Sequence, residues 1–330
     1  MPKNKVPFVI SILFSLTLLG FIGSLLIGKI NIFSLFFMPE KKQVALIILT
    51  ELRLPRAILA LLVGGSLGLS GAVLQGFLRN PLAESGIVGI SSGAALGAVL
   101  CISSGIGLYF SYLIPLSGMI GAILTAFILY CVLKKHFNIY TVILVGIAIN
   151  SLTSSATSVI LNLSKNPYAA LEIIFWLLGS IEGRDMDHVK LCLPFILMGW
   201  GILWYTRQGL DALSLGEETA QSLGYSTKSM YQKIIIGVAL CVGATVSISG
   251  VIGFVGLVVP HMLRVWVGQK PSDLLIPSLL GGGLIVLIAD ILTRLPLWHT
   301  ELKLGVVTAL IGSPFFIHLI FKYRKSYAGI

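Results

Sequence analysis

Charged residues are scarce in this chain. Of its 330 residues only 11% are charged and 13 are acidic, whereas 56% are hydrophobic. A soluble domain of this length carries roughly a quarter charged residues, so the composition excludes a water-soluble fold for most of the chain. The apolar runs are continuous and do not alternate over segments of about ten residues, which excludes a membrane β-barrel. We therefore expect an all-α polytopic membrane protein.

Motifs for metal binding and for catalysis are also missing. The four cysteines lie inside apolar runs without a CxxC pair, and the five histidines form no HExxH pattern. No serine in "GISSGAALG" (89–97) has an evident base beside it. The segment Gly23–Lys29 has the spacing of a phosphate loop, but Ile30 replaces the Ser or Thr that would bind Mg²⁺, and a membrane span precedes it. The sequence predicts no metal site, no bound cofactor and no ATPase site in this chain, which we expect not to be an enzyme.

The apolar runs predict about ten spans, because a helix needs about 20 apolar residues to cross a bilayer. The net charge of +10 is scattered over short loops, as expected of residues that flank membrane helices and not of a nucleic-acid partner. Residues 251–264 form a short, Gly-rich run that predicts a half-helix, and the apolar piece 173–178 is expected at the membrane interface. An even number of spans puts both termini on one side, taken as cytoplasmic. The predicted spans of this single domain, 1–330, are 7–28, 54–78, 86–107, 111–133, 141–163, 189–205, 233–249, 251–264, 274–293 and 304–321.

The loop 206–232 contains the polar stretch "SLGEETAQSLGYS" (214–226) between two apolar runs. Ser214, three residues before Glu217, forms a capping box that predicts a helix start, and Gly224 predicts its end. Thr219, Ala220 and Leu223 share one face of that helix by spacing. A short capped helix with a small apolar face indicates either a docking element on the cytoplasmic rim or an ordinary surface helix.

Two polar groups stand out among the spans. Asn150, Ser154 and Ser158 share one helical face in "NSLTSSATS", which indicates either the lining of a water-filled path or helix packing. Three arginines at the outer ends of spans oppose the usual charge bias, and indicate either capture of a partner's carboxylates or interface anchoring; they are Arg53, Arg56 and Arg294. Asp290 lies four residues before Arg294, so a local ion pair is expected there.

A family resemblance rests on four stretches in order. The first is "RLPRAILALLVGGSLGLSGAVLQGFLRNPLAESGIVGISSGAALG" (53–97), and the second is "LGEETAQSLG" (215–224). The others are "SGVIGFVGLVVPHMLR" (249–264) and "ADILTRLPLWHTELKLGVVTALIGSPFFIHLI" (289–320). Together they resemble permease subunits of the FecCD type, from bacterial ABC importers for iron-siderophores, haem and cobalamin, over the chain from about residue 40 onward.

The resemblance implies the type II ABC importer permease fold in the cytoplasmic membrane, paired with an identical or related permease chain. It implies two cytoplasmic ATPase subunits, which hold the ATP and Mg²⁺, and a substrate-binding protein outside. The implied ATPase-coupling residues are Leu215, Gly216, Glu217, Ala220, Leu223 and Gly224. Arg53, Arg56 and Arg294 match positions that dock the binding protein. Asn150, Ser154 and Ser158 lie on a path-lining helix, and Leu82 and Ile139 fall near the cytoplasmic gate.

The cargo is not fixed by these motifs. Iron complexes, siderophore or haem, are the expected cargo because such systems are the commonest, and cobalamin is the alternative. The sequence departs from the family pattern at Glu301-Leu302-Lys303, where Pro is usual in place of Lys303, and at Ile139, where a hydroxylated residue is frequent. Two other classes stay open: a secondary transporter that depends on Asp290, and an intramembrane enzyme.

Overall fold

A computed structural model describes residues 5–110, 112–134, 138–295 and 302–327, and every element within these ranges is helical. The long helices are joined by short turns, with a 3₁₀ turn at Pro39–Lys41, a π-helical turn at Ile48–Arg53 and a 3₁₀ turn at Ile106–Leu108. The α-helices are α1 (Lys5–Leu26), α2 (Ile32–Phe36), α3 (Lys42–Ile47), α4 (Leu54–Phe77), α5 (Ile90–Ser103), α6 (Leu113–Leu133), α7 (Ile139–Asn162), α8 (Pro167–Leu177), α9 (Met186–Tyr205), α10 (Arg207–Ser214), α11 (Glu217–Ser222), α12 (Thr227–Ser249), α13 (Val255–Val267), α14 (Pro271–Thr293) and α15 (Leu304–Tyr327).

Each predicted span contains one helix. Within the described residues, seven helical segments are long and apolar enough to cross a membrane, and they include α1, α4, α6, α7, α9, α12 and α14. α5 and α13 are shorter apolar helices. The predicted span 86–107 is therefore too long at both ends, because residues 86–89 and 104–107 form turns around α5. Residues 173–177 of the predicted interfacial piece form the end of a longer helix, α8, which starts at Pro167 after the N-cap residue Asn166; Leu178 is its C-cap.

The short helix predicted at 251–264 is present as α13, but it begins at Val255 and ends at Val267. α12 ends at Ser249, and the next residue, Gly250, has a φ of 69°, which lies in the left-handed region that glycine adopts without steric cost. Phe254 also has a positive φ, 67°, and α13 begins only at the next residue. Non-helical backbone at this depth is tolerated when protein covers it. Residues 250–254 are buried or half-buried, as that rule requires.

α4 is the central helix of the bundle, and it contacts α14 more closely than side chains would allow. A Cβ at Gly64 would clash with the carbonyl group of Gly282, and a Cβ at Gly68 would clash with the carbonyl oxygen of Ser278. Two helices can approach to backbone contact only where such small residues face each other. The glycines of α4 thus set the distance between α4 and α14.

Close helix contacts at glycines recur elsewhere in the bundle. A Cβ at Gly71 of α4 would clash with Gly256 of α13, and one at Gly93 of α5 would clash with Thr125 of α6. Gly121 of α6 in turn faces the Gly93 carbonyl. Lipid gives apolar helices no hydrophobic reason to associate, so close packing of this kind supplies much of the attraction between them.

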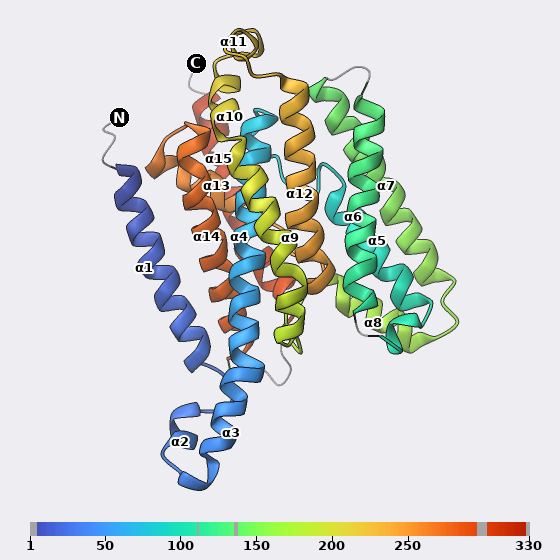
Figure 1. Cartoon of the computed structure of the whole chain (residues 1–330), viewed down its shortest axis with the longest axis vertical. Helices are drawn as coiled ribbons and strands as arrows, with labels where there is room; N and C mark the ends of the chain where they lie inside the picture. The colour runs from blue at the N-terminus through green and yellow to red at the C-terminus, as the bar shows by residue number, and fades with distance from the viewer. Residues whose placement is uncertain (1–4, 111, 135–137, 296–301, 328–330) are drawn as a thin grey trace.

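The two ends of the bundle differ (Figure 1). α10 and α11 stand at the end where α1 begins and α15 ends, whereas α2, α3 and α8 lie at the opposite end. Both ends of the described chain therefore lie on the side of the 206–232 loop, as the predicted topology requires. We call this side cytoplasmic and the opposite side outer.

Substitution of Gly68 by Ala tests the α4–α14 contact. The added methyl group would press on the Ser278 carbonyl, and overpacking of this kind costs about 1–3 kcal/mol. We expect Gly68→Ala to lower the thermal unfolding midpoint of the detergent-solubilised chain. Gly201→Ala in α9 is the matched control, because a Cβ there would have open space within 4 Å. Equal melting of the two variants would show that backbone contact does not hold these helices together.

Candidate functional site

The cytoplasmic projection consists of α10, α11 and the turn to α12, residues 207–226, and we call it the coupling knob. The predicted capping box is wrong. Ser214 is the last residue of α10, and its hydroxyl donates to the Asp211 carbonyl oxygen at 2.6 Å. Gly216 is the N-cap residue of α11, with no side-chain hydrogen bond. A serine that ends one helix bonds back to its own turn, so it is not free to cap the next.

The predicted end of α11 at Gly224 is confirmed. Gly224 has a φ of 85°, and its N–H donates to the Gln221 carbonyl at 2.9 Å. The N–H of Tyr225 donates to the Ala220 carbonyl at 2.8 Å. These two bonds form a Schellman motif, which satisfies carbonyls that the helix end leaves open. The motif fixes the direction in which the chain returns to α12.

The predicted apolar face of α11 divides into two parts. Ala220 is fully buried, so it packs inside the knob and cannot touch a partner. Leu215 and Leu223 are 69% and 58% exposed, and Thr219 is exposed beside them. These two leucines leave apolar side chains uncovered on a projection outside the apolar spans. The outward surface of the knob therefore carries Leu215 and Leu223, one at each end of α11.

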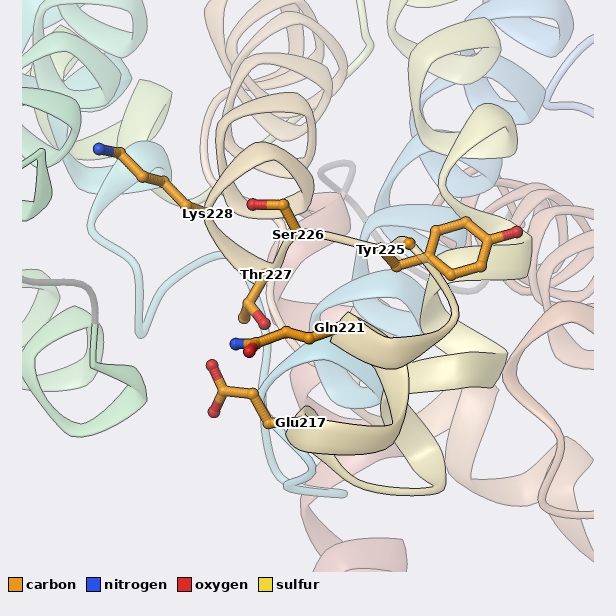
Figure 2. Close-up of a pocket in the computed structure, with 7 residues that line it drawn as sticks. Glu217, Gln221, Tyr225, Ser226, Thr227 and Lys228 are labelled. Atoms are coloured by element: carbon orange, nitrogen blue, oxygen red, sulfur yellow. The ribbon is translucent and has the colours of Figure 1, made fainter.

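A hollow of about 460 Å³ lies between α11 and the start of α12 (Figure 2). In this view Glu217 and Gln221 extend from α11 toward Thr227, while Lys228 points away from them. The hydroxyl of Thr227 is buried and has no hydrogen-bond partner within the described ranges. The hollow gives the knob a polar edge next to its two exposed leucines.

The knob is tied to α14 at its base. Asp211 of α10 accepts the backbone N–H of Ser272 at 2.9 Å, which caps the first turn of α14. Lys270 lies 3.6 Å from the second oxygen of Asp211. Leu210 and Leu213 of α10 are fully buried. A displacement of the knob would therefore act directly on the cytoplasmic end of α14.

α7 carries the predicted path residues on an uncovered face. Asn150, Ser154 and Ser158 are all exposed, and the Ser158 hydroxyl donates to the Ser154 carbonyl at 3.0 Å. The opposite face packs against α5 and α6 through buried residues, among them Gly146 and Ile149. The expected common face is confirmed. Its three polar side chains are not used for packing within this protomer.

Arg53 does not face outward. Its guanidinium donates to the carbonyl oxygens of Leu25 and Leu26, at 2.9 and 2.8 Å, and to that of Ile30. These carbonyls belong to the end of α1 and the turn after it, where the helix leaves acceptors unsatisfied. Arg53 is buried, so its role in this structure is to bind α1 to the start of α4.

Arg56 and Arg294 converge on one carboxylate. Arg56 Nε lies 2.8 Å from Asp290 Oδ1, and Arg294 Nη2 lies 2.7 Å from Asp290 Oδ2. Arg294 also donates to the carbonyl and hydroxyl of Ser24, at 3.1 and 2.6 Å, and Arg56 donates to the Thr293 hydroxyl. The expected pair of Asp290 with Arg294 is confirmed. All three outer arginines are engaged inside the protomer in this structure. The role of Arg53, Arg56 and Arg294 in docking a substrate-binding protein stays a prediction.

The gate residues lie on two segments that touch. Leu82 is half-exposed in the turn 78–89, and its N–H donates to Asn80 Oδ1 at 2.9 Å. Ile139 begins α7 and is half-buried against the main core. A Cβ at Gly146 of α7 would clash with the Ile87 carbonyl, so the turn is pressed against this helix. The gate role of both residues stays a prediction.

Within the described ranges, no group of three or more His, Cys, Asp or Glu side chains could hold a metal ion. All four cysteines are free thiols, and three of them are buried in the helix packing. The departure expected at Glu301-Leu302-Lys303 lies partly outside the described residues. Lys303 itself pairs with Glu182 at 3.0 Å on the outer side.

Comparison with known proteins places this geometry in a family. The model of the FecCD transport family matches residues 8–322. The chain is 38% identical to the cobalamin import system permease protein BtuC of Halobacterium salinarum, over 86% of this chain and 75% of that protein. It is 37% identical to the hemin transport system permease protein HmuU of Yersinia pestis, over 84% of each chain. A solved structure described as an inward-facing conformation of a metal-chelate type ABC transporter is 32% identical, with a TM-score of 0.84, over 96% of this chain and 99% of that one.

The buried cluster of Asp290, Arg56 and Arg294 predicts that the loss of Arg294 lowers thermal stability. Arg294→Gln removes one of the two cations from a buried carboxylate, and breaking such a pair costs about 3–5 kcal/mol. We expect a clearly lower unfolding midpoint in detergent. Lys190→Gln is the control, because its pair with Asp187 is exposed and contributes less than about 1 kcal/mol.

The same variant separates stability from docking. If Arg294→Gln melts like the unmodified chain and yet loses capture of a substrate-binding protein in a pull-down, Arg294 is a docking residue and the structural role is wrong.

Proposed function

The chain belongs to the FecCD transport family, and from this premise we propose that it carries an iron complex, siderophore or haem, through the cytoplasmic membrane. As a member of this family it is the membrane-spanning permease subunit of an ABC importer. The observation that carries the proposal is the coupling knob, whose exposed leucines flank α11 and whose α10 is bound to α14 through Asp211. Cobalamin is the alternative cargo, because relatives named for cobalamin and for hemin match the chain about equally well.

We propose that an ATPase subunit covers Leu215 and Leu223. The two side chains expose apolar surface on the cytoplasmic side, and Glu217 offers a charge beside them. Burial of one leucine side chain is worth about 1.5–3 kcal/mol, so a groove that receives both would hold the knob firmly. Gly216 and Gly224 supply the positive φ values that shape the two ends of α11.

We further propose that motion of the knob reaches the path through α14. Asp211 holds the first turn of α14, and α14 is in backbone contact with α4 along the bundle. Packed helices of this kind respond by discrete shifts and not by gradual deformation, which is what a two-state transporter needs. Closure of the ATPase subunits would then open one end of the path and close the other.

The path itself is proposed to follow the uncovered face of α7. A second permease chain set against this face would enclose Asn150, Ser154 and Ser158 in a shared passage. Hydroxyl and amide groups bind a passing complex weakly, which suits a permease whose substrate-binding protein supplies the affinity at the outer side.

Secondary transport has little support in the geometry. An ion-coupled carrier needs an acidic group that can gain and lose its partner within the membrane. Asp290, the acid expected for that role, is fully buried between Arg56 and Arg294. A carboxylate held by two arginines is a structural element of the fold.

The docking role of the knob predicts a loss of the ATPase subunit. With Leu215→Asp and Leu223→Asp together, we expect copurification of that subunit in mild detergent to fall at least about tenfold, because two buried leucines become charges. Leu163→Asp is the control, since it changes an equally exposed leucine at the far end of α7. Undiminished copurification would rule out the knob as the coupling element.

The path role of α7 predicts a separate phenotype. Ser154→Trp should lower uptake of radiolabelled iron complex by cells at least about fivefold while the ATPase subunit still copurifies, since a bulky ring would block the passage without touching the knob. Leu152→Trp is the control on the same exposed helix. Equal uptake by both variants would place the path elsewhere.

A further inference from the structure

A second cytoplasmic pocket lies beside the coupling knob, at the membrane boundary. It has a volume of about 410 Å³ and is formed by the end of α9, the start of α10, and the turn into α12. We call it the rim pocket. Its lining residues are Tyr205, Thr206, Arg207, Gln208, Gly209, Gly224, Tyr225, Ser226, Ser229, Met230 and Lys233.

The rim pocket is positively charged. Arg207 and Lys233 are among its lining residues, and none of the lining residues is acidic. The nearest acid in sequence, Asp211, is already engaged with Ser272 and Lys270. Two half-buried cations without a carboxylate in the same pocket favour an anionic ligand.

Aromatic rings hold both cations in place. The Arg207 guanidinium carbon lies 4.5 Å from the centre of the Trp204 ring, and Lys233 Nζ lies 4.6 Å from the centre of the Tyr205 ring. Cations placed over ring faces are stabilised there and lose less freedom when they bind a ligand. Long side chains that would otherwise extend into water are thus kept at the pocket.

Neutral donors complete the lining. Ser226 is the N-cap residue of α12, so the first N–H groups and the positive end of this 23-residue helix lie at the pocket. Ser229 contributes a second hydroxyl, and the Tyr225 hydroxyl donates to Gln208 at 3.4 Å. Hydroxyls, a helix N-terminus and two cations form a donor set that suits phosphate oxygens.

The position of the pocket identifies the source of the phosphate. Trp204 and Tyr205 end the apolar span of α9, where aromatic side chains mark the headgroup level of a bilayer. Tyr205 is 71% exposed, so this side of the pocket is open. A pocket at this depth meets lipid headgroups before it meets solutes.

A separate apolar groove lies farther along α12, on its side toward α6. Ser229, Lys233, Ile236 and Leu240 follow one stripe of the helix by their spacing of three to four residues. Ile236 and Leu240 also line a groove of about 440 Å³ between α6 and α12, together with Ile123, Phe127 and Ala239. This stripe of α12 thus changes from cationic at Lys233 to apolar at Ile236 and Leu240 in the direction of the membrane interior, as a headgroup and acyl chain would require.

We infer that the rim pocket binds the phosphate of an anionic phospholipid from the cytoplasmic leaflet, with an acyl chain along α12. Arg207 and Lys233 contact the headgroup, and the lipid holds the base of the coupling knob at a fixed depth. The inference is independent of the cargo and of the ATPase partner.

Native mass spectrometry of the purified chain tests this site. The chain is released from micelles that contain either phosphatidylglycerol or phosphatidylcholine, and bound lipids are counted. We expect retained phosphatidylglycerol, and a loss of about thirtyfold in the Arg207→Gln/Lys233→Gln variant, since each of the two cations near a membrane surface is worth about 1 kcal/mol. The control is Lys134→Gln/Lys228→Gln, which removes two exposed cytoplasmic charges from outside the rim pocket.

Three results would overturn the inference. Equal retention of phosphatidylglycerol by both double variants would mean that general surface charge holds the lipid. Displacement of the lipid by inorganic phosphate at millimolar concentration would identify a soluble anion as the ligand. If the Arg207→Gln/Lys233→Gln variant binds lipid normally but loses the ATPase subunit, the pocket is a protein contact; normal unfolding midpoints exclude misfolding as the cause.

Discussion

Backbone contact between α4 and α14 is the constraint on which the rest of this protein depends. Gly64 and Gly68 bring α4 against Gly282 and Ser278, and no residue with a Cβ would fit at either glycine without displacing the neighbouring helix. The distance between the two helices is therefore set by backbone atoms, which cannot change rotamer. In a lipid solvent this contact replaces the hydrophobic core of a soluble protein, and the other helices are arranged around it.

Polar interactions then fix the same two helices at their ends. On the outer side Asp290 of α14 is held by Arg56 of α4 and by its own Arg294, which also reaches α1 through Ser24. On the cytoplasmic side Asp211 of α10 caps the first turn of α14. A helix that is held at both ends and packed along its length moves as a unit. In the proposed mechanism α14 is therefore the connection between the coupling knob and the outer side of the bundle.

The helices of the protomer differ in how much of their surface other helices cover. α4 and α12 are almost entirely covered, whereas α7 is covered on one face only and shows three polar side chains on the other. The knob exposes leucines, and the neighbouring rim pocket collects cations over aromatic rings. The proposals above assign each of these surfaces a different neighbour: a second permease chain, an ATPase subunit, and the membrane itself.

The sequence by itself determined the class of protein, the position of each long helix and the local features: the half-helix near 251–264, the end of α11 at Gly224, the polar face of α7 and the pair of Asp290 with Arg294. All of these depend on residues within a few positions of one another, where helical spacing dictates the neighbours. Only the tertiary structure decided the direction of Arg53 and Arg56, which turn inward to α1 and to an aspartate 234 positions away. It also decided that Ala220 is buried and that Ser214 ends α10. Periodicity places a side chain on a face of its helix, but the packing of other helices determines whether that face meets a partner within the chain, lipid or another protein.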